Sequence, residues 1–230
     1  MTKLTKSGAG TENAEQRHVR IYKTIRERIS LLKYEPGTVL SEAELASEFA
    51  VSRTPIRKVL QRLHYEGLTE VRNGVGTIVT DINLKTLKEI YDLRMRLAEL
   101  MGELSPAVLT DEHSAALEQQ LEKVRALHGT HDYEGYARLC NDLEEIILTM
   151  IGSEPLREIT DLFYYRVSRI WFTFLPQLDW DEMVAFQEKE IISLLDAVRR
   201  NDMKGVGQIR RIYLHGILNY VSGYLSREVD

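Results

Sequence analysis

Apolar residues recur at spacings of three and four along most of the chain, which is the period of amphipathic helices. The first such segment covers residues 17–32 and ends before Pro36-Gly37. Two shorter helical segments follow, one after Ser41 and one after Ser52, since serine is a favoured N-cap residue and the apolar period resumes after each. Residues 1–16 are polar and lack a period, so we expect them to form a disordered tail.

The pattern changes between Leu68 and Thr80, where two short β-type runs flank the dipeptide Asn73-Gly74. Asn-Gly is a strong hairpin signal because both residues tolerate positive φ. Gly67 separates the hairpin from the helical segment before it. The order of helix, helix, turn, helix and hairpin predicts a winged helix-turn-helix over residues 17–81.

Beyond Asp81 every periodic segment is helical, and caps or helix breakers separate the segments. We predict helices over residues 84–103, 111–128, 133–151, 154–175, 180–200 and 202–226. Helices of this length joined by short connections are typical of a bundle. The predicted fold is therefore mainly α, with an N-terminal winged helix-turn-helix followed by an all-α six-helix bundle over residues 82–230.

The net charge of −5 is unevenly divided along the chain. Residues 1–80 carry 13 Lys and Arg against 9 Asp and Glu, whereas residues 81–230 carry 17 against 26. A basic module joined to an acidic domain is typical of a nucleic-acid-binding protein with a partner or sensor domain, although solvated surface charge produces the same asymmetry by chance. Charge alone therefore does not decide the function.

Other features of the composition exclude whole classes of protein. Cys140 is the only cysteine, which excludes an internal disulfide and a Cys-rich zinc module. No apolar run approaches the roughly 18 residues that a membrane span needs, and residues 1–10 lack the apolar core of a secretory signal. We therefore expect a cytoplasmic protein that does not span a membrane.

The third helical segment carries candidate chemistry for DNA binding. Arg53, Thr54 and Arg57 fall near its start, where a recognition helix meets base edges and phosphates. Each arginine offers a planar fork that can bond guanine O6 and N7 together, and the threonine can bond phosphate or touch a thymine methyl group. The alternative is a solvated basic face whose arginines pair with Glu66 or Glu70.

Residues 36–80 resemble the DNA-binding domain of the GntR family of bacterial transcription regulators. The chain matches the pattern PG-x-x-L-x-E-x-x-LA and then SRTP-x-R-x-x-L-x-x-L-x-x-x-GL. The resemblance implies operator contacts from the recognition helix and the wing tip, and it departs from family habits only at Ala43 and Lys58, which leaves the operator sequence open. The candidate DNA-binding residues are Ser52, Arg53, Thr54, Arg57, Lys58, Arg62, Arg72, Asn73 and Gly74.

The helical remainder resembles the C-terminal effector domain of the FadR-like branch, called FCD, on KEIYDLRMRL, NDLEEIILTMIGSEPL and EIISLLDAVRRND. Many family members hold a divalent metal there. The positions that the resemblance implies as ligands are Cys140, Glu144, Ile191 and Tyr213. Because isoleucine cannot ligate and a phenol is a poor ligand, we predict no family-type metal and no cofactor. The alternative is a residual zinc site on Cys140, Glu144 and His215, which requires a different register of the last helix.

Charged and aromatic residues on buried stripes suggest an effector pocket. Arg94 lies on the apolar face of its helix and needs a partner, which is either an effector carboxylate or phosphate, or Glu144 or another acid. Arg166 also lies on an apolar stripe, and for it we favour a structural ion pair over effector binding. Aromatics on all sides of 163–174 require a second cover, from a dimer interface, a ligand cavity or core packing. The candidate effector-binding residues are Arg94, Cys140, Glu144, Arg166, Tyr213 and His215.

These patterns lead to one functional hypothesis and two alternatives. We expect a homodimeric transcription regulator that binds a double-stranded DNA operator of two-fold symmetry and responds to a small-molecule effector, an acidic metabolite. The first alternative is a DNA-binding dimer without an effector. The second is a metal-dependent or carboxylate-based enzyme, which we disfavour because the chain lacks a Gly-rich phosphate loop, an H-E-x-x-H motif and a G-x-S-x-G element.

Overall fold

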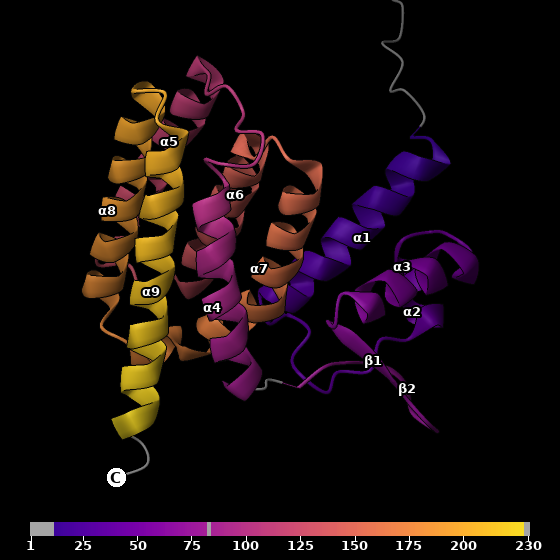
Figure 1. Ribbon diagram of the computed structural model, residues 1–230. Coiled ribbons are helices and arrows are strands. Elements are labelled where there is room, and N and C mark those ends of the chain that lie inside the picture. The colour runs from indigo at the N-terminus through magenta and orange to yellow at the C-terminus, as the bar shows by residue number, and fades with distance from the viewer. Residues whose placement is uncertain (1–11, 82–83, 228–230) are drawn as a thin grey trace, which may run out of the picture.

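The computed structural model describes residues 12–81 and 84–227, which form a winged helix domain beside a helical bundle (Figure 1). The winged helix domain is built from helices α1 to α3 and a two-stranded antiparallel sheet. The bundle consists of helices α4 to α9. The predicted fold class is confirmed, because each segment with a helical or hairpin pattern forms the expected element.

Helix α1 spans Ala14–Ser30 and begins three residues earlier than its apolar period indicated. Asn13 caps the helix in a reciprocal pair with Gln16: its side chain accepts from the Gln16 amide at 2.8 Å, and its own amide donates to the Gln16 side chain at 3.0 Å. The expectation of a disordered tail is therefore wrong for residues 13–16. Residues 1–11 lie outside the described part of the chain.

The rest of the winged helix domain follows the predicted order. Helix α2 covers Glu42–Glu48 and α3 covers Arg53–Tyr65. Strands β1 (Thr69–Arg72) and β2 (Gly76–Val79) then pair in an antiparallel register. Gly74 adopts φ +76° at the turn between them, which a residue with a side chain rarely does. The hairpin thus projects as a wing from the end of α3.

The bundle contains the six predicted helices. They are α4 (Leu84–Leu100), α5 (Asp111–Arg125), α6 (Tyr133–Met150), α7 (Glu154–Phe174), α8 (Trp180–Arg199) and α9 (Met203–Arg227). Helix α4 packs against α9 and α7, and α5 packs against α8 and α6. A 3₁₀ turn at Leu175–Gln177 follows α7 because Pro176 cannot continue the helical hydrogen bonds.

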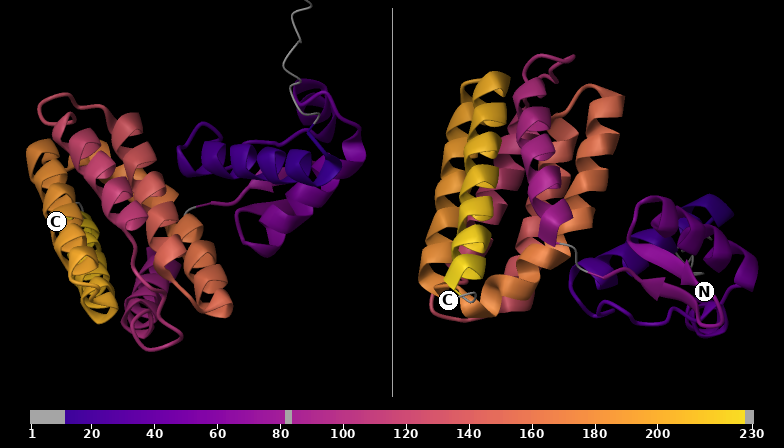
Figure 2. Two further views of the ribbon diagram at one scale, coloured as in Figure 1. Left: turned by 90° about the horizontal axis from the view of Figure 1, so that it is seen from above. Right: turned by 60° about the horizontal axis from the view of Figure 1, so that its bottom comes forward.

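Helix α7 faces the winged helix domain, as both views in Figure 2 show, and α6 also reaches it through the ion pairs of Glu145 with Lys23 and of Arg138 with Glu27. Helix α1 packs against α7. Tyr164 and Tyr165 of α7 belong to the same apolar cluster as Ile21 and Ile25 of α1. The two domains therefore share a packed interface, with α7 as its wall.

Candidate nucleic-acid interface and ligand cavity

The N-terminal turn of α3 is the exposed tip of the winged helix domain. Ser52, Arg53 and Thr54 are exposed there, and the Ser52 hydroxyl makes no capping hydrogen bond to the helix. Within residues 12–81 and 84–227, Arg53 and Lys58 form no ion pair. Two of the candidate cations are therefore directly available to an anionic partner.

Arg57 is held by a carboxylate on the neighbouring helix. Its Nε donates to Glu42 Oε1 at 3.0 Å and its Nη2 donates to Glu42 Oε2 at 2.8 Å. The hydrogen bonds from Arg57 hold the pKa of Glu42 below its ordinary value. The guanidinium therefore lies fixed on the exposed surface beside the first turn of α3.

Arg62 and Arg72 form the ion pairs with Glu66 and Glu70 that the alternative of a solvated basic face predicts. Arg62 Nε donates to Glu66 at 2.9 Å, and its guanidinium lies 3.7 Å from the centre of the Tyr22 ring. Arg72 Nη2 donates to Glu70 at 2.8 Å on the wing. Both arginines remain partly exposed, with Asn73-Gly74 at the exposed wing tip. The tip of α3 therefore offers cations without an intramolecular partner among the described residues, whereas the arginines farther along α3 and on the wing are paired.

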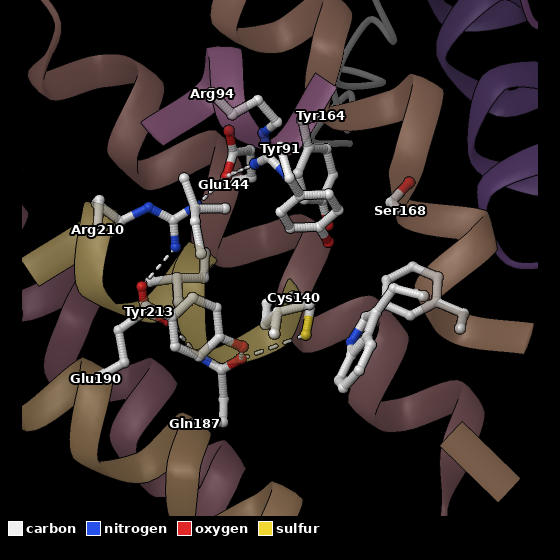
Figure 3. Close-up of a pocket in the computed structure, with 15 residues that line it drawn as sticks. Tyr91, Arg94, Cys140, Glu144, Tyr164, Ser168, Gln187, Glu190, Arg210 and Tyr213 are labelled. Carbon is white, nitrogen blue, oxygen red and sulfur yellow. Dashed lines mark hydrogen bonds and ion pairs between the residues drawn. The ribbon is translucent and has the colours of Figure 1, made fainter. Parts of the chain in front are cut away.

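A small cavity lies inside the bundle, between α4, α6, α7, α8 and α9 (Figure 3). Its free volume is about 30 Å³, which is room for one or two water molecules. Of the candidate effector-binding residues, those that line it are Arg94, Cys140, Glu144 and Tyr213. These four residues come from helices α4, α6 and α9, and the fold places them around one cavity.

The other two candidates lie elsewhere. His215 is exposed on α9, where its ring nitrogen is 3.2 Å from the Asn219 amide, because two residues along a helix turn a side chain to the opposite face from Tyr213. Arg166 points to the winged helix domain, and its Nε donates to the Glu66 carbonyl at 2.7 Å. Neither residue contributes to the cavity, so we remove both from the candidate site.

Four buried charges form a network along one side of the cavity. Arg210 donates to Glu144 and to Glu190 at 2.5 Å each, whereas Arg94 approaches Glu144 only at 3.5 Å. Burial raises the pKa of Glu190, and Arg210 opposes that shift. The partner expected for Arg94 is present, but its contact is the weakest in the network.

Sequence reasoning missed Arg210, Glu190 and Gln187. The argument applied to Arg94 would have found Arg210, because it lies four residues after the buried Val206 and three before Tyr213 on one stripe of α9. Gln187 bridges the network to the rest of the wall: its Nε2 donates to Glu190 at 2.8 Å, and its Oε1 accepts from Tyr213 and from Cys140.

These residues do not fit the family metal. Ile191 is fully buried in the apolar core, and Glu144 is occupied by Arg210. Burial raises the pKa of the Cys140 thiol, which opposes the thiolate that a metal needs. The residual zinc alternative fails as well, since His215 faces outward. Among the residues that the structure describes, no group of three His, Cys, Asp or Glu side chains could hold a metal ion.

Helix α7 connects the cavity wall with the winged helix domain. Arg169 Nη1 donates to the Thr80 carbonyl at 2.6 Å, and Arg26 donates to Asp161 at 2.6 Å. Burial lowers the pKa of Arg169 to about 10, so the side chain is still charged at neutral pH. The Arg26 guanidinium also lies 3.7 Å from the centre of the Tyr165 ring.

A chain of buried hydrogen bonds runs from the cavity wall to the end of α1. Tyr164 and Ser168 line the cavity. Tyr164 donates to Asn141 Oδ1 at 2.7 Å, and Ser30 of α1 donates to the same oxygen at 3.2 Å. The hydroxyls of Ser30 and Ser168 are 3.1 Å apart. The aromatic residues of 163–174 are therefore covered in two ways. Trp171 and Phe172 line the cavity, and Tyr165 packs against the winged helix domain.

Two family models match the chain. The model of bacterial regulatory proteins of the gntR family matches residues 17–79, and that of the FCD domain matches residues 89–215. Within residues 12–81 and 84–227, none of the helices combines the length and apolar character needed to cross a membrane.

Curated relatives carry similar descriptions. The uncharacterized HTH-type transcriptional regulator YdhC of Bacillus subtilis (strain 168) is 30% identical over 146 residues, which are 63% of this chain and 65% of that protein. The HTH-type transcriptional repressor RspR of Escherichia coli (strain K12) is 24% identical over 185 residues, which are 78% of this chain and 81% of that protein.

Solved structures share the fold at low sequence identity. E. coli McbR/YncC has a TM-score of 0.75 at 20% sequence identity. The match covers 93% of this chain and 99% of that chain. A putative transcriptional regulator GntR from Rhodococcus sp. RHA1 has a TM-score of 0.68 at 18% sequence identity. The match covers 90% of this chain and 98% of that chain.

Proposed function

Because the chain belongs to the GntR family of bacterial regulatory proteins and carries an FCD domain, we propose that it is a homodimeric, DNA-binding transcription regulator controlled by a small acidic effector. It acts in the cytoplasm, where its operator lies, and it is not an enzyme. The observation that supports DNA binding best is the exposed tip of α3, where Arg53 is unpaired among the described residues and Arg57 is held in a fixed orientation.

The tip is suited to the major groove. Its first turn offers free backbone N–H groups and an uncapped serine hydroxyl to phosphate, while the two arginines reach base edges. Asn73-Gly74 lies at the exposed wing tip and suits the adjacent minor groove. Two copies related by a two-fold axis would read two half-sites, and the acidic bundle would face away from the duplex.

The bundle cavity is the proposed effector site. It has the buried cation that an acid needs, and its wall is hydrogen-bonded to α1 through Tyr164, Asn141 and Ser30. A ligand that shifts this wall would therefore shift the winged helix domain. The alternative, a dimer without an effector, is supported by the small free volume of the cavity.

The DNA-binding proposal is tested with an operator selected from random DNA by the wild-type protein. Arg53→Ala and Arg57→Ala should each weaken binding to that operator by about tenfold or more. Arg200→Ala serves as the matched control, because Arg200 is the exposed residue that follows α8 and pairs only with Asp196 among the described residues. Unchanged operator binding in both tip variants at moderate salt would refute the proposal.

A further inference from the structure

We propose that Arg166 is a positioning residue for DNA recognition: from the bundle it completes the C-terminal cap of the recognition helix α3 and so fixes the orientation of that helix. The inference rests on the proposed function, which places the tip of α3 in the major groove. It goes further, because it assigns a role in operator recognition to a side chain that belongs to the other domain and binds the opposite end of α3.

The end of α3 leaves two carbonyl groups unfilled by its own turn. Glu66 is the C-cap residue, and Gly67 follows with φ +76°, so the helix ends in a Schellman motif. The amides of residues 66–68 donate to the carbonyls of residues 62–64 at 2.9–3.0 Å. Among the described residues, no backbone amide donates to the carbonyls of Tyr65 and Glu66. These two acceptors therefore need donors from outside the turn.

Arg166 supplies both donors from α7. Its Nε donates to the Glu66 carbonyl at 2.7 Å, and its Nη2 donates to the Tyr65 carbonyl at 3.4 Å. The carbonyl end of a helix is the negative end of its dipole, so a cation there adds an electrostatic attraction to the two hydrogen bonds. The cap of α3 is therefore formed partly by its own domain and partly by the bundle.

The guanidinium of Arg166 is enclosed by its neighbours. It lies 5.5 Å from the centre of the Phe163 ring, one turn earlier on α7. A β-carbon added to Gly67 would come within 3.3 Å of its Nε, so the glycine permits this close approach as well as the turn. Among the described residues Arg166 forms no ion pair, so no carboxylate competes with the α3 carbonyls for it. The half-buried side chain is therefore part of the cap.

Arg169, one turn further along α7, holds the base of the wing. It donates to the carbonyl and the hydroxyl of Thr80 at 2.6 Å each, and that hydroxyl donates to the Gly67 carbonyl at 2.9 Å. Gly67 thus lies between the two anchored points, where α3 ends and the chain enters the wing. The recognition helix and the wing are therefore fixed by the bundle at their common base.

The length of α3 makes its tip sensitive to a change at this base. The helix has 13 residues and is about 20 Å long, so a small tilt at one end displaces the other end further. The base edges that Arg53 and Arg57 would bind accept a narrow range of distances and angles. Loss of the Arg166 cap should therefore weaken binding to the operator more than binding to unrelated DNA, which depends on phosphate contacts.

Fluorescence anisotropy on the full chain tests this assignment, with the operator selected by the wild-type protein and with an unrelated duplex. Arg166→Met removes both donors and keeps an unbranched apolar side chain. It should bind the operator about tenfold less tightly and unrelated DNA as the wild type does. Arg166→Lys should recover part of the loss, since it keeps the charge and a donor. Arg166→Gln replaces the methionine variant if that variant does not fold.

The salt dependence of operator binding separates positioning from direct contact with DNA. Arg166 binds α3 about 20 Å from its tip, which is well beyond the Debye length of about 8 Å at physiological salt. The slope of log affinity against log salt should therefore be the same in Arg166→Met and in the wild type. A slope reduced by about one phosphate contact would show that Arg166 touches DNA and would overturn the proposal.

Arg157 offers a matched control on the same helix. It also donates to the carbonyl of a C-cap residue, that of Ile151 at the end of α6, at 3.4 Å, but within the bundle. Arg157→Met should leave both DNA affinities unchanged. Hydrogen exchange adds a readout without DNA: the amides of residues 66–68 should exchange faster in Arg166→Met and not in Arg157→Met. Equal losses of operator affinity in the two variants would indicate general destabilisation and would overturn the proposal.

The outcomes separate this inference from the proposed function. If Arg53→Ala and Arg57→Ala lose operator binding while Arg166→Met retains it, the positioning role is overturned and the DNA-binding regulator stands. If neither tip variant loses operator binding, the proposed function fails and this inference fails with it. A loss in Arg166→Met that is specific to the operator and partly recovered in Arg166→Lys supports both.

Discussion

Glu42 holds Arg57 side-on, through Nε and Nη2, and so leaves the end of the guanidinium free. The free edge, formed by Nη1 and the second hydrogen of Nη2, has the spacing that guanine O6 and N7 require. Glu42 is therefore a positioning residue for base recognition by Arg57, although its own charge repels phosphate.

This relationship predicts that Glu42→Gln binds its operator less tightly, by about tenfold, because the orientation of Arg57 is lost. Its affinity for unrelated DNA should be unchanged or higher, since a negative charge has been removed. Fluorescence anisotropy with both DNAs measures the ratio. Glu48→Gln is the control, because it removes a charge from the same helix but frees Arg28 instead. Equal tightening in both variants would mean that Glu42 acts only by repulsion.

Arg169→Met should weaken the packing of the winged helix domain against α7. The variant removes two hydrogen bonds of 2.6 Å from Arg169 to Thr80, and charged hydrogen bonds of this kind contribute about 1.5 to 3 kcal/mol each. Backbone amides around Thr80 should exchange hydrogen faster, while those of α5 and α8 keep their protection. Uniformly faster exchange throughout the chain would show global destabilisation instead. Arg200→Met, at the exposed C-terminal end of α8, is the control, because Arg200 pairs with Asp196 of the same helix.

The contact between Glu134 and Lys33 makes domain docking sensitive to acid. Hydrogen bonds from Lys33 and from Arg138 lower the pKa of Glu134 from its ordinary 4.5. The unfolded chain therefore takes up the proton first as pH falls, so this contribution to stability is present above pH 4.5 and is lost as pH falls through the lowered pKa.

Unfolding temperatures of the wild type and of Glu134→Gln should accordingly differ most near neutral pH. The difference should shrink on acidification and be lost as pH falls through the lowered pKa of Glu134. Glu103→Gln is the control, because Glu103 is exposed and forms no ion pair among the described residues. A difference that stays constant throughout this acidification would contradict the assignment.

Metal removal should leave the protein unchanged. Because Ile191 is fully buried in the core and Arg210 occupies Glu144, we expect dialysis against a chelator to alter neither the unfolding temperature nor operator affinity. Added zinc should have no effect on either quantity. Elemental analysis of the purified protein should find far less than one zinc per chain, and a stoichiometric amount would contradict the prediction.

The sequence was sufficient for the fold because the apolar period and the helix breakers agree. Ser41 and Pro176 mark helix ends where the structure has them. The start of α1 was missed because its cap, Asn13, precedes the first apolar position by several residues. Helix limits set by capping alone are invisible to a periodicity argument.

The cavity was predictable only in part, for a related reason. Periodicity shows that Arg94 and Arg166 are drawn into an apolar stripe, but it does not show what covers that stripe. In the structure Arg94 faces a cavity and Arg166 faces another domain. The difference depends on where the winged helix domain docks, and no local pattern in α7 contains that information.

The position of α7 has a consequence for how this regulator can diversify. Tyr164 and Ser168 line the cavity, and the residue after each of them, Tyr165 and Arg169, holds the winged helix domain, all within two turns of the helix. The two surfaces adjoin on the same helix, and Tyr164 and Ser168 also belong to the contacts with α1. A substitution that reshapes the cavity for a new molecule therefore disturbs the seat of the other domain at once. Under the proposed function, a change of effector and a change of the resting affinity for the operator are therefore coupled through one helix.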